Sequence, residues 1–309
     1  MQNNASIVVV LGTGGTIAGT AADPMDNVGY TAGQLGVAQL VQAVPALSAS
    51  ALEAEQVAQL DSKDMSHAVW KALALRCAHH LARAEVAGIV VTHGTDTLEE
   101  TAWFLQRVLA PTKPVVITGA MRPATALQSD GPQNVLDAVR VAQSPGACGV
   151  VAVFAGQVHS ARDVRKVHTY RIDAFSSGDA GPIGVIEEGR LRLFRAWPEG
   201  EALGVHRLPD DDAAWPQVEI VTSHAGAGGA MVGALRAAGV QGIVVSGTGN
   251  GTLHHELDAA LRDAQAHGVR VMRSSRCANG RVLPTGDALP AADDLPPAKA
   301  RVELMLQLL

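Results

Sequence analysis

The chain has 309 residues, which is long enough for two domains or one large one and for a substantial buried core. Hydrophobic residues make up 47% of it but aromatic residues only 3%, so its apolar content is mainly aliphatic, as suits helices packed on buried strands. The formal net charge of −6 argues against a nucleic-acid-binding protein or a polybasic membrane anchor, because both need an excess of cations.

In the first half of the chain, short β-branched runs alternate with helical patterns. The runs lack polar alternation, which predicts strands buried on both faces, at 7–11, 89–92, 115–118 and 150–154. Apolar residues three and four apart predict helices at 66–84 and 98–109. Strand–helix–strand repetition predicts an α/β fold with a mainly parallel sheet flanked by helices.

The pattern weakens after residue 181, where short strand-like pieces lead into a stretch rich in proline, glycine and aspartate. It then resumes with strands at 218–222, 242–246 and 269–272 and helices at 228–238, 255–267 and 299–309. We therefore predict a larger N-terminal α/β domain, a linker and a smaller C-terminal α/β domain, at 1–195, 196–216 and 217–309.

The sequence contains few signals of cell location or of cofactor binding. No apolar run approaches the roughly 20 residues that span a bilayer, and the start, Met1-Gln2-Asn3-Asn4, lacks the basic region of a secretory signal. We expect a cytoplasmic protein, or a periplasmic one if a signal has been removed. Cys77, Cys148 and Cys277 are far apart and in no metal-binding spacing, so we expect packed free thiols, no metal and no other cofactor.

A glycine-rich turn, Gly12-Thr13-Gly14-Gly15-Thr16-Ile17-Ala18-Gly19, follows the first predicted strand, at the end where open parallel sheets bind ligands. A dinucleotide fingerprint starting at Gly12 needs a glycine where Ile17 stands, and the Gly-Lys-Ser/Thr of a P-loop is absent. The turn instead displays the hydroxyl of Thr16 among backbone amides, which suits a nucleophile.

A second Gly-Thr turn, His93-Gly94-Thr95-Asp96-Thr97, follows the strand at 89–92. Helix capping explains Thr97 and the acidic Glu100, but it does not explain a second such turn at the end of a neighbouring strand.

These two turns resemble the two signature segments of bacterial L-asparaginases and asparaginase-glutaminases. Similar motifs continue in the same order along nearly the whole chain, at 61–65, 119–123, 129–132, 156–166, 247–251 and 273–276. The resemblance implies two α/β domains, an amidohydrolase activity on L-asparagine and no cofactor.

The resemblance also implies the roles of five catalytic residues. Thr16 attacks the β-carboxamide to form a β-aspartyl ester that water then cleaves, and Tyr30, in the predicted loop 23–31, lies on a mobile lid beside it. Thr95, Asp96 and Lys166 form a second cluster, in which the lysine polarises a hydroxyl or the attacking water. Which threonine attacks first, and how the proton transfers are shared, stays open.

Substrate binding is implied for six residues. Asp96 holds the α-ammonium group, and Ser62 holds the α-carboxylate with help from backbone amides of the turns. The other expected substrate-binding residues are Gly15, Thr95, Ala120 and Asn250, of which Asn250 reaches the active site of the neighbouring subunit. A site shared in this way implies a homotetramer built as a dimer of dimers.

Two departures from the family pattern concern charged residues. Many relatives have glutamine where Lys63 stands. We expect Lys63 to turn away from the site or to pair with Asp64 or with an acid of another chain, and a solvated loop lysine with no role is the alternative. Secreted relatives have a glutamate near the C-terminal region that reaches the site of a neighbouring subunit. The stretch 277–298 is shorter here than in those relatives, and Asp287 is only a candidate for the equivalent acid.

The alternative functions are a glutaminase-asparaginase of broader specificity, an amidase for another small α-amino-acid amide, and a non-catalytic α/β module that binds a small ligand. No nucleic-acid or membrane partner is expected.

Overall fold

The computed structural model describes residues 6–286 and 289–309, and it divides the chain into two compact units. The first unit ends at His206 and the second begins at Arg207. This division lies inside the segment 196–216 that was expected to be a linker, and the exact domain bounds stay a prediction.

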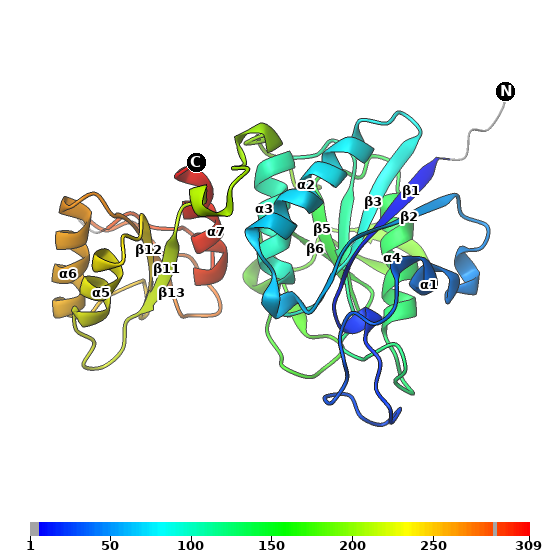
Figure 1. Ribbon diagram of the computed structural model, residues 1–309, viewed down its shortest axis with the longest axis horizontal. Helices are drawn as coiled ribbons and strands as arrows, with labels where there is room; N and C mark the ends of the chain where they lie inside the picture. The colour runs from blue at the N-terminus through cyan, green and yellow to red at the C-terminus, as the bar shows by residue number, and fades with distance from the viewer. Residues whose placement is uncertain (1–5, 287–288) are drawn as a thin grey trace. The chain divides into compact units, whose positions relative to one another are not determined.

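The first unit is built on one large sheet (Figure 1). Its strands are β1 (Ile7–Gly14), β2 (Leu52–Leu60), β3 (Val86–Thr92), β4 (Val115–Thr118), β5 (Val150–Phe154), β6 (Gln157–Ser160), β9 (Gly184–Glu187) and β10 (Arg190–Leu193). Within the described residues the strand order is β10-β9-β6-β5-β4-β3-β1-β2. The strands from β5 to β2 pair in parallel, whereas β6, β9 and β10 join by antiparallel pairing. The sheet is therefore mainly parallel, as predicted.

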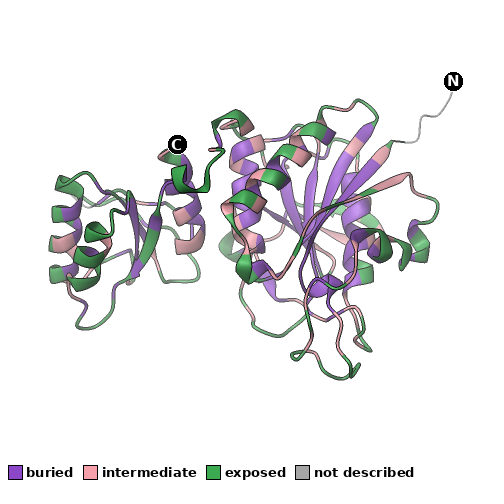
Figure 2. Cartoon of the chain, viewed as in Figure 1, coloured by how far each residue is buried: buried purple, intermediate pink, exposed green. Residues whose placement is uncertain are grey.

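Helices cover both faces of this sheet. They are α1 (Val37–Gln42), α2 (His67–Leu81), α3 (Leu98–Leu109) and α4 (Gly131–Ala142). Helices α2 and α3 pack on each other and on one face, and α1 and α4 pack on the other (Figure 1). Because both faces are covered, every residue of β4 and β5 is buried, which explains their continuous aliphatic sequence (Figure 2).

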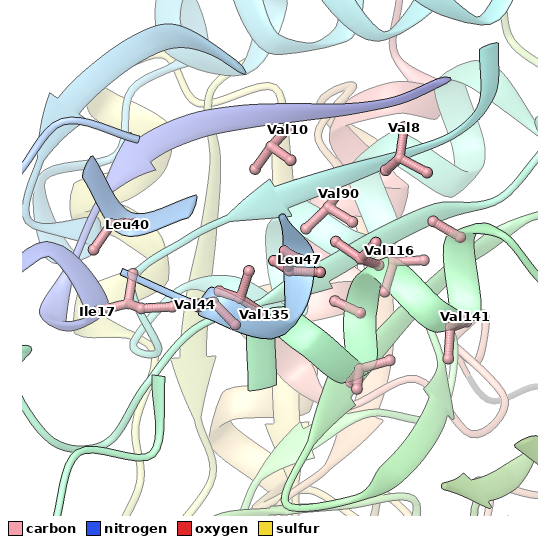
Figure 3. Close-up of a cluster of buried hydrophobic side chains, with 14 of the residues drawn as sticks. Val8, Val10, Ile17, Leu40, Val44, Leu47, Val90, Val116, Val135 and Val141 are labelled. Atoms are coloured by element: carbon pink, nitrogen blue, oxygen red, sulfur yellow. The ribbon is translucent and has the colours of Figure 1, made fainter. Parts of the chain in front are cut away.

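The core on the side of α1 and α4 is made of alternate strand residues. Val8 and Val10 of β1, Val90 of β3 and Val116 of β4 point to the same side, since side chains along a strand alternate between the two faces. Figure 3 shows them against residues of the two helices and of the short 3₁₀ helix η2 (Pro45–Leu47), among them Leu40, Val135, Val141 and Leu47.

Short elements connect the larger ones. The 3₁₀ helices η1 (Thr16–Ala18) and η3 (Ser62–Asp64) follow β1 and β2, and β7 (Arg165–Lys166) pairs with β8 (Phe175–Ser176) in a small antiparallel hairpin. Three further 3₁₀ helices are η4 (Gly178–Ala180), η5 (Val205–Arg207) and η6 (Asp212–Ala214).

The second unit has its own parallel sheet, in the order β11 (Val218–Thr222), β12 (Gly242–Gly247), β13 (Arg270–Ser275). Its helices are α5 (Ala230–Ala237), α6 (His255–Ala266) and α7 (Pro297–Gln307). Helices α5 and α6 pack on each other, and α7 packs on the sheet. A separate aliphatic cluster around Ile243, Val245 and Leu261 forms the core of this unit.

No helix in the described ranges combines the length and the apolar character needed to cross a bilayer. The cysteines are free: Cys77 is buried, and burial raises its pKa to about 12, while Cys148 is half-buried. Cys277 is exposed, so the expectation of a packed thiol is wrong at that position.

Candidate active site

The turns that carry Thr16 and Thr95 touch through their backbones. Gly14 and Gly15, which link β1 to η1, have φ of +99° and +82°, a conformation open to glycine but strained for other residues. A Cβ atom on Gly15 would overlap the backbone of Gly94 in the turn after β3. The absence of a side chain at Gly15 therefore lets the two turns lie directly against each other.

Ser62 packs on the second of these turns. It follows β2, it is only 2% exposed, and a Cβ atom on Gly94 would overlap its side chain. Its Oγ accepts a hydrogen bond from the backbone N–H of Asp96 at 3.2 Å, and its carbonyl oxygen accepts one from Oγ1 of Thr97 at 2.8 Å. The structure thus brings Ser62 beside Thr95 and Asp96, from strands that are neighbours of β1.

Thr16 and Tyr30 are joined by a short hydrogen bond of 2.6 Å between Oγ1 and Oη. Tyr30 lies in loop 20–31, whose base is closed by two backbone hydrogen bonds between Thr20 and Thr31, of 3.0 and 2.9 Å. The Tyr30 ring lies over Gly19, where an added Cβ atom would be 2.8 Å from Cδ2 of the ring. Thr16 is buried, so the loop places a phenol on a shielded hydroxyl.

Lys166 joins the second group of expected catalytic residues. Its Nζ atom donates to Oγ1 of Thr95 at 2.8 Å and to Oδ1 of Asp96 at 2.6 Å. Because the ammonium group occupies a lone pair of the Thr95 hydroxyl, the proton of that hydroxyl stays available for donation. The backbone N–H of Lys166 donates to Oε2 of Glu99 at 2.6 Å, so the first turn of α3 holds the β7 strand in place.

His93 holds the turn that carries Thr95 through a buried chain of hydrogen bonds. The indole N–H of Trp70 donates to Oγ1 of Thr101 at 2.8 Å, Thr101 lies 3.0 Å from Nε2 of His93, and Nδ1 of His93 lies 2.7 Å from the carbonyl oxygen of Gly94. An indole can only donate and a carbonyl can only accept, which assigns the proton of a neutral His93 to Nδ1. Complete burial lowers the pKa of His93 to about 4 and keeps it neutral.

Two other expected site residues lie in different settings. Ala120 is fully buried just after β4. Asn250 lies in the second unit, where its side-chain amide accepts from the backbone N–H of Leu283 at 2.7 Å and donates to the Leu283 carbonyl at 3.2 Å.

Lys63 pairs with a different acid from the one expected. Its Nζ atom lies 3.0 Å from Oδ2 of Asp61, and this hydrogen bond raises the pKa of Lys63, with smaller contributions from the charges of Asp64 and Asp96. Its side chain is 65% exposed, which fits a surface ion pair. Asp287 lies outside the described residues.

The sequence interpretation missed Glu99 and the role of His93. Glu99 stands in an acidic pair that is typical of a helix N-terminus, and nothing in the sequence indicates that it meets a backbone N–H 67 residues later. His93 stands in the second Gly-Thr turn, and a histidine directly after a strand that is buried along most of its length was the available signal of a buried ring.

Comparison with known proteins decides the family. The model for the N-terminal domain of asparaginase matches residues 7–199, and the model for the glutaminase/asparaginase C-terminal domain matches residues 217–309. The chain belongs to the asparaginase family. The resemblance inferred from the sequence motifs is confirmed.

Some relatives of this asparaginase-family chain are named L-asparaginase, and others are named glutaminase-asparaginase. It is 40% identical to L-asparaginase 2 of Bacillus subtilis (strain 168), over 97% of this chain and 81% of the relative. It is 37% identical to the glutaminase-asparaginase of Pseudomonas fluorescens biotype A, over 97% of this chain and 86% of the relative.

A solved structure shares the two-unit asparaginase fold. The crystal structure of a probable cytoplasmic L-asparaginase from Campylobacter jejuni is 38% identical and matches with a TM-score of 0.89, over 98% of this chain and 95% of that one.

Proposed function

We propose that this chain is an L-asparagine amidohydrolase that converts L-asparagine and water to L-aspartate and ammonia. One observation carries the proposal beyond family membership. Two buried threonine hydroxyls lie on turns in direct contact, one bound to a phenol and the other to an ammonium–carboxylate pair. A carboxamide is a poor electrophile, so its hydrolysis needs this combination of a nucleophile and proton-transfer groups.

In the proposed mechanism Thr16 is the nucleophile. Its Oγ1 atom attacks the side-chain carbonyl carbon of asparagine while the Tyr30 hydroxyl, 2.6 Å away, accepts the Thr16 proton and passes its own proton to the amide nitrogen. The C–N bond then breaks, the protonated nitrogen leaves as ammonia, and a β-aspartyl ester remains on Thr16. Water cleaves that ester with help from Thr95, whose hydroxyl is bound to Lys166, and regenerates the threonine.

Substrate recognition follows from the same geometry. One oxygen of Asp96 binds Lys166, and the carboxylate is exposed enough to hold the α-ammonium group of the substrate. Ser62 accepts from the backbone N–H of Asp96, so its own hydroxyl proton is free to meet the α-carboxylate. Backbone groups of Gly15 and Ala120 complete the binding site in this proposal.

Removal of either hydroxyl tests the mechanism. Thr16→Ala and Thr95→Val should fold normally and lower kcat for asparagine by about 100-fold or more, because each removes a reacting or proton-transferring group. The matched control is Thr118→Val, which removes a buried hydroxyl that bonds the Val153 carbonyl, and it should keep its kcat. A Thr16→Ala variant with wild-type turnover would show that the mechanism is wrong.

The choice of amide substrate needs its own assay. The Pseudomonas relatives named glutaminase-asparaginase favour L-glutamine as a second substrate. Ammonia release on L-asparagine, L-glutamine and their D-isomers should be highest for L-asparagine. Faster release from L-glutamine would favour the broader enzyme, and nucleotide binding with no release from any of them would favour a binding module.

We further propose that the chain acts as a homotetramer in which Asn250 serves the site of a neighbouring subunit. The backbone N–H and carbonyl groups of Leu283 fix the orientation of the Asn250 amide within its own chain. Sedimentation at assay concentration should give a tetramer, and dissociation should abolish activity. A fully active monomer would contradict this.

The cytoplasm remains the proposed location. The Campylobacter jejuni structure is described as cytoplasmic, whereas a Haemophilus influenzae relative, 36% identical, is named periplasmic. Fractionation of the native cells should recover the activity with cytoplasmic markers, and release with the periplasmic fraction would overturn this location.

A further inference from the structure

The chain has only two tyrosines, and the second, Tyr170, also lies near the site. It stands at the tip of the β7–β8 hairpin, four residues after Lys166. The hairpin is closed by the backbone N–H of Val167, which donates to the Ala174 carbonyl at 2.8 Å. At the tip, the N–H of Tyr170 donates to Nδ1 of His168 at 3.0 Å. These bonds fix the backbone at Tyr170, which is 46% exposed.

Arg122 holds this ring from another segment. Its guanidinium carbon lies 4.1 Å from the centre of the Tyr170 ring, which is a close cation–π contact. Its Nη1 atom also donates to the Tyr170 carbonyl at 2.7 Å. The backbone of Arg122 is itself fixed, because its N–H and that of Met121 donate to the two oxygens of Asp130 at 2.9 and 3.0 Å.

The hydroxyl of Tyr170 contacts loop 20–31. It accepts a hydrogen bond from Nδ2 of Asn27 at 3.4 Å. Next to Asn27, the Asp26 carboxylate accepts from the backbone N–H groups of Val28 and Gly29 at 2.9 and 2.7 Å, and these bonds lower the pKa of Asp26. The tip of the loop is therefore an organised turn that presents Asn27 to Tyr170.

Segment 121–130 already supports one side of loop 20–31. The N–H of Ala124 donates to the Gly19 carbonyl at 2.9 Å, Oγ1 of Thr125 accepts from Ala21 at 2.8 Å, and the N–H of Leu127 donates to the Pro24 carbonyl at 3.2 Å. At the tip, Met25 and Val28 are 70% and 76% exposed, so burial of apolar surface contributes little there. The side of the tip that carries Asn27 is joined to the β7–β8 hairpin by its polar contact with Tyr170.

We propose that Tyr170 is a positioning residue that latches loop 20–31 onto segment 121–130 and so keeps Tyr30 on the Thr16 hydroxyl. This inference rests on the proposed roles of Thr16 and Tyr30. Because Tyr170 and Lys166 share one hairpin, the latch also ties the loop to the segment that carries the second catalytic cluster. A lid held by a few polar contacts opens for substrate and product when those contacts break.

Two variants separate the parts of the latch. Tyr170→Phe keeps the ring under Arg122 and loses only the bond to Asn27, whereas Tyr170→Ala loses both contacts. Tyr170→Ala should raise KM for asparagine about tenfold, and Tyr170→Phe about threefold, with kcat changed less than KM. Adding Asn27→Ala to Tyr170→Phe should cost less than Asn27→Ala alone, because both changes remove the bond between Asn27 and Tyr170, and only the bond of Asn27 to the Met25 carbonyl is then left to lose.

Limited proteolysis reports on the loop without relying on catalysis. An endoproteinase that cleaves at aspartate meets Asp23 and Asp26 in the loop, and cleavage there should be about tenfold faster in Tyr170→Ala than in the wild type, since the loop opens more often. Saturating L-aspartate should protect the wild-type loop more than that of the variant. The matched control is Ile172→Ala, another exposed side chain on the same hairpin, which should behave as the wild type.

The outcomes distinguish the latch from the mechanism. If Tyr170→Ala is cleaved no faster than Ile172→Ala, or if its KM equals that of Ile172→Ala, the latch is overturned. If the loop results hold while Thr16→Ala keeps its turnover, the proposed nucleophile fails and the contact between Tyr170 and the loop stands.

Discussion

The buried His93 makes the stability of the fold depend on pH between about 4 and 6.5. In the unfolded chain a histidine has a pKa near 6.5, whereas burial lowers the pKa of His93 to about 4 in the folded protein. As the pH falls through this window, His93 becomes protonated in the unfolded chain but stays neutral in the folded protein. Stability contributed by the neutral ring is therefore complete above pH 6.5 and is lost as the pH falls toward 4.

The size of the effect follows from the two pKa values. Between pH 7.5 and pH 5, proton uptake by the unfolded state lowers the free energy of unfolding by about 2 kcal/mol. Carboxylates with a lowered pKa act below this range. Glu55, for example, has a pKa lowered from 4.5 to about 2 by its bonds to Arg76, and its contribution is lost only below 4.5. Burial raises the pKa of Asp130 and Asp137, but both carboxyls are common to the wild type and a His93 variant, so their effect cancels in the comparison. The network around His93 is satisfied only by the neutral ring, because Thr101 donates to the nitrogen that protonation would occupy.

Urea unfolding at pH 7.5 and pH 5 measures this contribution. His93→Asn keeps a donor near the Gly94 carbonyl but cannot titrate, so its free energy of unfolding should fall by about 2 kcal/mol less than that of the wild type over this interval. The control is His79→Asn, which replaces an exposed histidine of α2 and should retain the wild-type dependence. Equal losses of stability in His93→Asn and the wild type would refute the reasoning.

Three further substitutions test particular contacts. Gly15→Ala should abolish activity and destabilise the fold well beyond Gly146→Ala, which also has a positive φ but meets no atoms and should cost about 1 kcal/mol in chemical unfolding. Glu99→Gln, which weakens the acceptor for the Lys166 backbone, should lower kcat about tenfold with little change in melting temperature, and an unchanged kcat would exclude a positioning role. Lys63→Gln should lower KM for asparagine and keep turnover within a few-fold, whereas an unchanged or higher KM would show that the lysine is neutral or helpful.

Strands buried on both sides were predicted from the sequence without difficulty. The runs of β1, β3, β4 and β5 are mainly aliphatic, with threonine only near the ends of β1, β3 and β4, and all four were located. The edge strand β2 was not, because it alternates apolar residues with Glu53 and Glu55, whose carboxylates pair with Arg83 and Arg76. Helix α4 was missed because its Gly131-Pro132 start is typical of a turn, although proline is also accepted in the first turn of a helix.

The site divides in the same way. Thr16 and Thr95 could be found because they follow strands of a parallel sheet, which gather at one edge, and because the surrounding motifs resemble a known family. Contacts made by Glu99 and Tyr170 could not, since their partners lie 67 and 143 residues away. Such pairings depend on how the loops fold over the edge of the sheet, and no local sequence pattern indicates how they fold.

The direct contact between the glycine turns has a consequence for redesign of the substrate range. Main-chain atoms of Gly15 and Gly94 set the spacing between the two turns that carry the threonines. Because neither glycine has a side chain, a change of side-chain size cannot adjust that spacing. Repacking the aliphatic core changes how firmly the sheet is held but leaves the same atoms in contact. A laboratory selection for a longer amide substrate should therefore accumulate its changes in loop 20–31 and the β7–β8 hairpin, while the two turns stay as they are.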